Sequence, residues 1–184
     1  CEGCGQYNYK KFHLTNQNIV FTATEEEKKA AILSAMNTTI TRVNGVFERD
    51  LAVKMVLVGE NDKIIFLDAS TDELSNSDPG DLIAESQIVC DTKIGSDNYD
   101  IGHTFSTGGG GLAQLNSPCT FTGKARGITG SRSPIGDAYD IDFVAHEMGH
   151  QFGANHTFNG DTGNCTGGNR NASTAYEPGS GSTI

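Results

Sequence analysis

The eleven residues from His146 to His156 constrain this chain more than any other stretch of it. They read HEMGHQFGANH, which places three histidines, one glutamate and one glycine in the pattern H-E-x-x-H-x-x-G-x-x-H. His146 and His150 are four residues apart, so on an α-helix their side chains project from one face, about one turn apart. Asp140 or Asp142 would supply the N-cap or the first-turn negative charge of that helix. The spacing therefore predicts a helix that presents two imidazoles to a single metal ion.

Gly153 and His156 complete the set of ligands. A third ligand six residues beyond His150 cannot come from the same straight helix, so the chain has to turn. Glycine adopts positive φ without steric cost and commonly ends helices. Three neutral imidazoles leave the fourth position of a tetrahedral zinc to water, which is the pattern of a catalytic site. We therefore predict one catalytic Zn2+ bound by His146, His150 and His156.

Glu147 is the predicted catalytic residue. It follows His146 directly and so points to a neighbouring edge of the helix, toward a zinc-bound water rather than the ion. Zinc lowers the pKa of such a water to about 7. Glu147 would act as general base, taking the proton during attack on a carbonyl and passing it to the leaving amine. The alternatives are an accidental helix with buried histidines and a metal site without catalysis, which would have no need of this carboxylate.

The signature resembles that of the metzincin zinc endopeptidases. The preceding GGGGLA, from Gly108 to Ala113, resembles the reprolysin or adamalysin branch, especially its bacterial secreted members. Thr157 follows the third histidine, where animal adamalysins carry Asp, astacins Glu and matrix metalloproteinases Ser, so this departure favours a bacterial subgroup. The resemblance extends from about Ala35 to the C-terminus. It implies an α/β fold: a metzincin-type catalytic domain with a twisted mixed sheet, a long backing helix and an active-site helix.

The resemblance also assigns a role to the glycine-rich segment. It implies an edge strand above the cleft, whose backbone N–H and C=O groups bind an extended peptide by strand addition. Glycine would let the substrate backbone approach closely. A phosphate cradle is disfavoured because no lysine follows at P-loop spacing, whereas a flexible glycine linker stays an alternative. The predicted substrate-binding residues are Gly110, Gly111, Leu112 and Ala113.

Two further helices are predicted from local patterns. From Glu25 to Asp50 the apolar residues recur at helical spacing, and Thr24 with Glu27 forms a capping-box pattern at the start. A shorter helix is expected from Asp81 to Cys90. The stripe of the long helix is interpreted as core, without any chemical role.

Four segments resemble strands in their apolar and β-branched content. They are Leu51 to Val58, Lys63 to Leu67, Tyr99 to Ser106 and Lys124 to Ile128. His103, within the third segment, is interpreted as a structural residue. The acidic stretch from Ser70 to Asp81 is interpreted as a solvated loop rather than a Ca2+ site, because its spacing fits no defined calcium loop.

Length and charge limit the possible functions. A chain of 184 residues is expected to form one domain, so we take residues 1–184 as a single catalytic domain. The net charge of -10 argues against a nucleic-acid partner, which would require a basic face. No apolar run approaches the roughly 20 residues of a membrane span. The expected partner is a protein or peptide substrate.

The cysteines predict an oxidising environment. A disulfide between Cys90 and Cys119 is favoured, and Cys1 with Cys4 is expected to form a small terminal disulfide or a disordered end. Cys165 is then left over, which suggests a partner in further C-terminal sequence. Disulfides imply secretion or a periplasmic location. The last residues, Ser-Thr-Ile, resemble those just before the metzincin Met-turn, so we expect a chain truncated there, and a propeptide in the full-length protein.

These observations predict a secreted zinc-dependent endopeptidase, a hydrolase with Glu147 as general base. The alternative is a catalytically silent, zinc-containing binding or adhesion module on the same fold. A peptidase whose third ligand is the downstream Glu177 is disfavoured, because Gly153 and His156 already supply a correctly spaced histidine.

Overall fold

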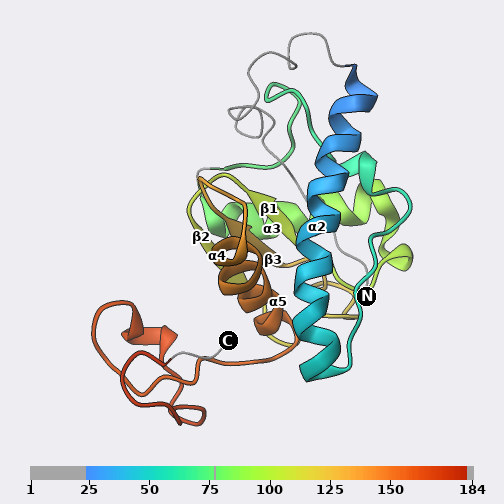
Figure 1. The fold of residues 1–184 in the computed structure, drawn as a ribbon. Helices are drawn as coiled ribbons and strands as arrows, with labels where there is room; N and C mark the ends of the chain where they lie inside the picture. The colour runs from blue at the N-terminus through green and yellow to red at the C-terminus, as the bar shows by residue number, and fades with distance from the viewer. Residues whose placement is uncertain (1–23, 77, 182–184) are drawn as a thin grey trace.

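The computed structural model describes residues 24–76 and 78–181, and its long helix α2, Glu25–Leu51, runs along one side of the layered body (Figure 1). Both arms of the predicted capping box are present, since Thr24 Oγ1 accepts from the Glu27 N–H and Glu27 Oε2 from the Thr24 N–H. The helix ends at Ala52, whose φ of 54° is left-handed. The predicted helix is thus confirmed to within one residue. Its buried face comprises Ile32, Met36, Thr39, Ile40, Val43, Asn44 and Phe47.

Three short strands form a mixed sheet in the order β1-β3-β2. They are β1 (Thr104–Ser106), β2 (Gly110–Ala113) and β3 (Gly127–Gly130). β1 runs parallel to β3, whereas β2 is antiparallel to it and lies at the edge of this sheet. The mixed sheet and the edge strand were both expected. β1 covers only the last three residues of the predicted strand, and β3 starts three residues later than predicted.

The two predicted strands between α2 and the acidic loop are wrong. Leu51 still belongs to α2, and residues 52–58 have no regular secondary structure and pair with no strand in the described part of the chain. Instead, the side-chain amide of Asn44 bonds both backbone groups of Met55, at 2.7 and 2.8 Å. Residues 63–67 begin inside a 3-10 turn, Asn61–Ile64. Short apolar runs show only burial, so periodicity cannot distinguish a strand from a buried irregular segment.

Helix α3, Pro79–Cys90, confirms the predicted second helix and covers one face of the sheet. The carboxylate of Asp78 caps it by accepting from the N–H groups of Gly80 and Asp81. Thr104 of β1 donates its hydroxyl to Ser86 of α3 at 2.8 Å. Ile128 of β3 packs into the same core cluster as the apolar residues of α3.

The opposite face of the sheet is covered by a second helical stretch, comprising α4 (Asp137–Tyr139), a π-helical turn (Asp140–Ala145) and α5 (His146–Gln151). Phe105 of β1 packs with Tyr139 and Met148 from this stretch. The same core cluster includes the buried apolar residues of α2. The fold is therefore layered, with α3, the sheet, the α4–α5 stretch and α2 following one another (Figure 1).

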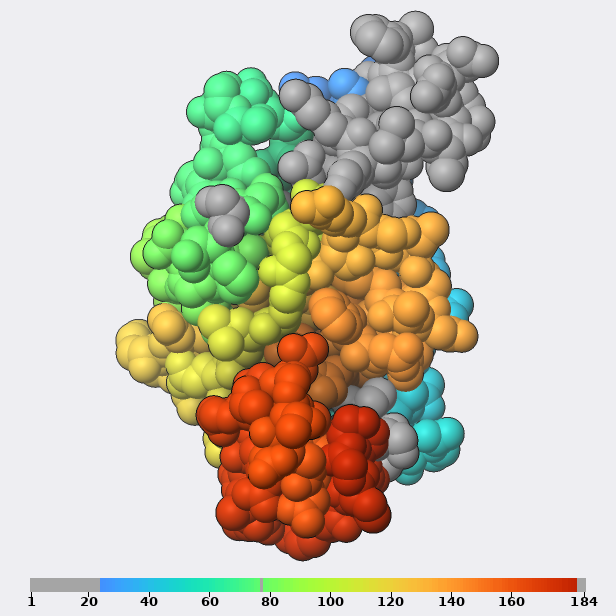
Figure 2. Space-filling view, turned by 90° about the vertical axis from the view of Figure 1, so that its left-hand side faces the viewer, coloured from blue at the N-terminus to red at the C-terminus, as the bar shows by residue number. Residues whose placement is uncertain are grey.

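The chain beyond α5 is mostly irregular, as expected. Up to residue 181 it contains two 3-10 turns, Gly163–Cys165 and Gly167–Asn169, and one isolated bridge between Phe158 and Glu177. Figure 2 shows this part as a lobe at one end of the molecule. None of the helices described is both long and apolar enough to cross a membrane.

The predicted disulfide between Cys90 and Cys119 is wrong. Cys119 is an exposed free thiol, and Cys165 is also free. Cys90 is disulfide-bonded, but to neither of them. Cys119 lies in a turn with a φ of 61°, a backbone arrangement that sequence spacing does not reveal. The predictions for Cys1, Cys4 and the Ser-Thr-Ile end concern residues outside the described ranges.

Candidate metal centre

The helix that carries the first two histidines starts earlier than predicted. It begins at Asp137, just after Gly136, and neither Asp140 nor Asp142 caps it. The Asp140 carboxylate is instead buried, accepts a hydrogen bond from Thr39 Oγ1 at 2.8 Å and forms an ion pair with Arg42 Nε at 2.9 Å. Both partners belong to α2. The acidic residue predicted as a cap therefore ties the helix of the site to the backing helix.

Gly153 ends this helix and turns the chain. Its φ is 97°, the left-handed conformation expected of glycine at this position. The turn is closed by backbone hydrogen bonds from Gly153 N to His150 O at 2.8 Å and from Ala154 N to Gly149 O at 3.0 Å. The chain beyond this turn brings His156 beside His146 and His150. The reversal predicted from the glycine is present.

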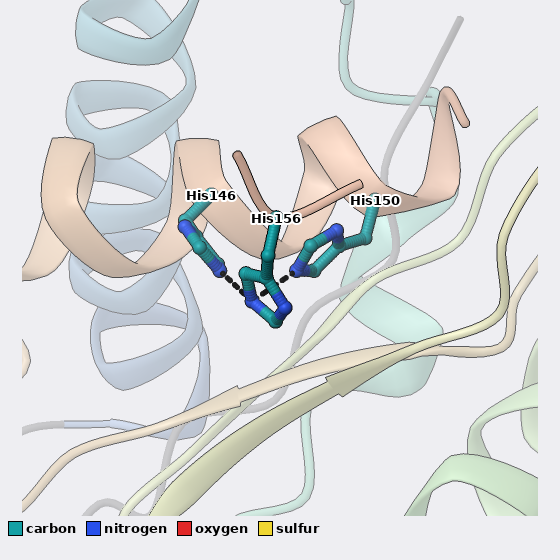
Figure 3. A group of neighbouring side chains, drawn as sticks. All are labelled: His146, His150 and His156. Atoms are coloured by element: carbon teal, nitrogen blue, oxygen red, sulfur yellow. Dashed lines mark hydrogen bonds between the residues drawn. The ribbon is translucent and has the colours of Figure 1, made fainter. Parts of the chain in front are cut away.

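The three predicted ligands converge on one point (Figure 3). His156 Nε2 lies 3.2 Å from His146 Nε2 and 3.2 Å from His150 Nε2. All three side chains are half-buried. In the ranges that the structure describes, this is the only group of three or more histidine, cysteine or acidic side chains arranged to hold a metal ion.

Backbone carbonyls fix the protonation of two of these rings. His150 Nδ1 lies 2.7 Å from Ala154 O, and His156 Nδ1 lies 2.7 Å from Asn169 O. A carbonyl only accepts hydrogen bonds, so each Nδ1 carries the proton and each Nε2 presents a lone pair. Such contacts to the second nitrogen are typical of metal-binding histidines. Neither backbone partner could have been predicted, because a carbonyl has no side-chain signature.

The geometry fits a zinc ion. Two lone pairs 3.2 Å apart repel one another unless a cation lies between them. Nitrogens bound at 2.0–2.1 Å to a tetrahedral zinc lie about 3.3 Å from one another. Burial, followed by the neighbouring imidazoles, lowers the pKa of His146 to about 4, and burial lowers the pKa of His150 as well. The neutral imidazole favoured in this way is the form that binds metal.

Glu147 follows His146 on α5 and packs against the edge strand. A Cβ atom added to Gly111 of β2 would lie 2.2 Å from Glu147 Oε1, so the carboxylate packs directly against this glycine. Burial raises the pKa of Glu147 to about 7. The predicted base is thus a desolvated carboxylate beside the predicted substrate strand.

The pairing of β2 with β3 determines which backbone groups of β2 point toward the unpaired edge of the sheet. Gln114 N donates to Arg126 O at 2.8 Å, which marks this position of the register as a hydrogen-bonded pair. Hydrogen-bonded and non-bonded pairs alternate along antiparallel strands. The backbone N–H and C=O groups of Gly111 and Ala113 therefore point away from β3. All four predicted substrate-binding residues lie on this strand, and Gly110 and Leu112 are exposed.

A cavity of about 320 Å³ adjoins the three histidines. The ring of Phe158 stacks on His156, with 4.8 Å between the ring centroids. The rest of the wall comes from the irregular C-terminal part, including Asn164, Cys165, Asn169, Ser180 and Gly181. Sequence patterns missed this contribution, because glycine- and asparagine-rich segments carry no periodic signal.

Comparison with known families gives one match. A family model described as Metallo-peptidase family M12B Reprolysin-like matches residues 33–157. The match runs from within α2 to the residue after the third histidine and so covers more than half of the chain. No curated protein matches the chain.

Proposed function

The chain belongs to the reprolysin-like metallopeptidases of family M12B, and from this membership we propose that it is a secreted zinc endopeptidase that hydrolyses peptide bonds. We infer that residues 1–184 form a single catalytic domain. The observation that carries the proposal is the convergence of three imidazole nitrogens, two of them on the helix that also carries the half-buried carboxylate of Glu147. Secretion, of the bacterial type suggested by Thr157, rests on the resemblance to secreted members.

The edge strand supports binding of an extended peptide. Gly111 and Ala113 turn unpaired N–H and C=O groups outward, which an antiparallel peptide strand would pair with. Gly111 also contacts Glu147, so a peptide on this edge would pass beside the carboxylate. Strand addition recognises backbone rather than side chains, which suits an enzyme that cleaves within polypeptides.

His146, His150 and His156 would hold the zinc ion, and Glu147 would move the proton. When bound, zinc supplies a Lewis acid that polarises a carbonyl and makes water acidic enough to react near neutral pH. The carboxylate of Glu147 would accept a proton from the attacking water and return it to the leaving amine. A general base whose pKa lies near 7 exchanges protons efficiently at that pH.

Replacing Glu147 by Gln tests the proposal. The variant keeps the size of the side chain and should bind zinc in the same one-to-one ratio, but cleave a denatured protein substrate at least about 100-fold more slowly. Glu48→Gln, at a glutamate of α2 half-exposed in an ion pair with Lys54, is the matched control and should cleave like the wild type. Equal cleavage by Glu147→Gln and the wild type would refute the assignment. Stoichiometric zinc without any cleavage by the wild type would favour the silent binding module.

A further inference from the structure

Gln151, the last residue of α5, is a fully buried polar side chain next to a predicted zinc ligand. Its amide nitrogen donates to Gly102 O at 2.9 Å and to Ser117 Oγ at 3.3 Å. Its backbone carbonyl accepts from Ser117 N at 2.9 Å. The C-terminal end of α5 is thus hydrogen-bonded to two segments distant in the sequence, at Gly102 and at Ser117.

His103 extends these bonds to the sheet. His103 Nδ1 lies 2.7 Å from Gln151 Oε1, and His103 Nε2 lies 2.8 Å from Thr129 Oγ1. Because the carbonyl of Gly102 can only accept, the amide nitrogen of Gln151 faces it and the amide oxygen faces the ring. His103 therefore donates from Nδ1 and accepts the Thr129 hydroxyl proton at Nε2. Both nitrogens of a neutral ring are satisfied, and the bonds run in one direction from β3 to α5.

Thr129, the last residue of this hydrogen-bonded series, is linked to the Glu147 carboxylate through the edge strand. Thr129 is paired with Gly111 in the register of β3 and β2. Gly111 in turn contacts Glu147, which is on α5. A continuous series of contacts therefore leads from Gln151 through His103, Thr129 and Gly111 to Glu147. Its first and last residues, Gln151 and Glu147, both belong to α5.

We propose that Gln151, His103 and Thr129 form a clamp that fixes the position of α5 relative to the edge strand. The inference rests on the proposed function, since it assigns these side chains the task of holding Glu147 beside a peptide bound to β2. Apolar packing alone tolerates small shifts between a helix and a sheet, whereas directional hydrogen bonds in a buried site set one spacing. The three are positioning residues, because none of them contacts the metal-binding nitrogens of the predicted ligands, and Thr129 reaches the substrate strand only through its pairing with Gly111.

Thr129→Val is the most direct test, because it removes one hydroxyl and leaves the shape of the side chain unchanged. Thr104→Val is the matched control: Thr104 is a buried threonine of the neighbouring strand, and its hydroxyl bonds Ser86 of α3 rather than the clamp. Thr129→Ser restores the hydroxyl. Two measurements are made on each full-length variant: hydrogen exchange of the amides in residues 146–154, with and without zinc, and kcat/KM on a fluorogenic peptide with the zinc content recorded.

We expect Thr129→Val to speed exchange in residues 146–154 about tenfold and to lower kcat/KM at least tenfold, with zinc still bound one to one. A misplacement of about 1 Å is sufficient for such a loss. Thr104→Val and Thr129→Ser should resemble the wild type in both measurements. The clamp is refuted if the two valine variants behave alike, or if exchange speeds up while kcat/KM stays unchanged. A wild type that binds zinc without cleaving refutes the proposed function instead, and the exchange comparison still tests the clamp.

Discussion

Burial shifts the pKa of two side chains near helix α5 in opposite directions. It lowers the pKa of His103 to about 4, an effect that the hydrogen bond to Gln151 partly offsets, and it raises the pKa of Glu147 to about 7. In both cases the charged form loses its hydration. His103 therefore stays neutral at physiological pH, as its two hydrogen bonds require, while Glu147 can exchange a proton there.

The depressed pKa of His103 predicts a loss of stability in acid. The unfolded chain takes up a proton on this histidine below about pH 6.5, but the folded protein does so only below about pH 4. The contribution is thus complete above pH 6.5, declines as the pH falls to 4 and is then constant. It amounts to about 3 kcal/mol. Urea unfolding at pH 7 and pH 4 should show this loss in the wild type, and a correspondingly smaller one in His103→Asn. Equal pH dependence of the two proteins would contradict the prediction.

The contact between Gly111 and Glu147 leads to a second prediction, on the effect of adding a side chain at Gly111. In Gly111→Ala the new methyl group would have to displace the Glu147 carboxylate, which lies 2.2 Å from the Cβ position. We expect kcat/KM to fall at least about tenfold, because displacing a catalytic group weakens proton transfer, while zinc binding is retained. Gly109→Ala is the control, since a Cβ at Gly109 would meet no atom within 4 Å. Similar kinetics of the two alanine variants would contradict the expected displacement.

At the scale of elements, the π-helical turn before α5 is anchored by Asp140. Its buried carboxylate bonds Thr39 and Arg42 of α2. Asp140→Asn should lower the free energy of unfolding by about 1–2 kcal/mol, because the buried carboxylate loses its ion pair with Arg42, which is partly exposed and keeps Asp137 as a second partner. Asp142→Asn changes an exposed carboxylate of the same turn and should have little effect. Chemical denaturation of both variants tests this, and equal losses would show that the anchor contributes nothing specific.

The helices could be predicted from neighbouring residues in the sequence. Strands form only by pairing with residues far away in the sequence, so their positions could not be predicted in the same way. The capping box at Thr24 and the helix end at Gly153 each depend on residues only a few positions apart, so both can be recognised in the sequence. Residues 52–58 form no strand, and the backbone of Met55 bonds the side chain of Asn44 where a neighbouring strand was expected. Nothing in an apolar run distinguishes these two outcomes.

The same distinction applies to the site. The predicted ligands and the predicted base lie within eleven residues, so their spacing alone was sufficient to propose them. The groups that orient them come from elsewhere: the carbonyl of Asn169, the ring of His103 and the hydroxyl of Thr129. These contacts exist only once the sheet and the C-terminal part have folded. The sequence indicated a structural role for His103, and its hydrogen bond to Gln151 adds a link to α5.

At the scale of the whole molecule, the predicted zinc ligands join two parts of the chain. His146 and His150 belong to the layered body, whereas His156 begins the irregular C-terminal part. The latter is fastened to His156 by hydrogen bonds from His156 Nδ1 to Asn169 O and from Thr174 Oγ1 to His156 O, both 2.7 Å. A metal bound to all three histidines would therefore hold this part against the body.

Removal of zinc should loosen the C-terminal part before the body unfolds. Zinc present at a thousand times its dissociation constant stabilises the folded state by about 4 kcal/mol, so a chelator should lower the Tm. Limited proteolysis followed by mass spectrometry should then find new cleavage within residues 157–181 and none within α2. Adding back Zn2+ should restore both the Tm and the resistance, whereas Ca2+ should not, because imidazole nitrogens suit zinc and calcium prefers oxygen ligands. His156→Asn should behave like the chelated wild type whether or not zinc is added. Unchanged melting and cleavage after chelation would show that the three histidines do not join the two parts through a metal ion.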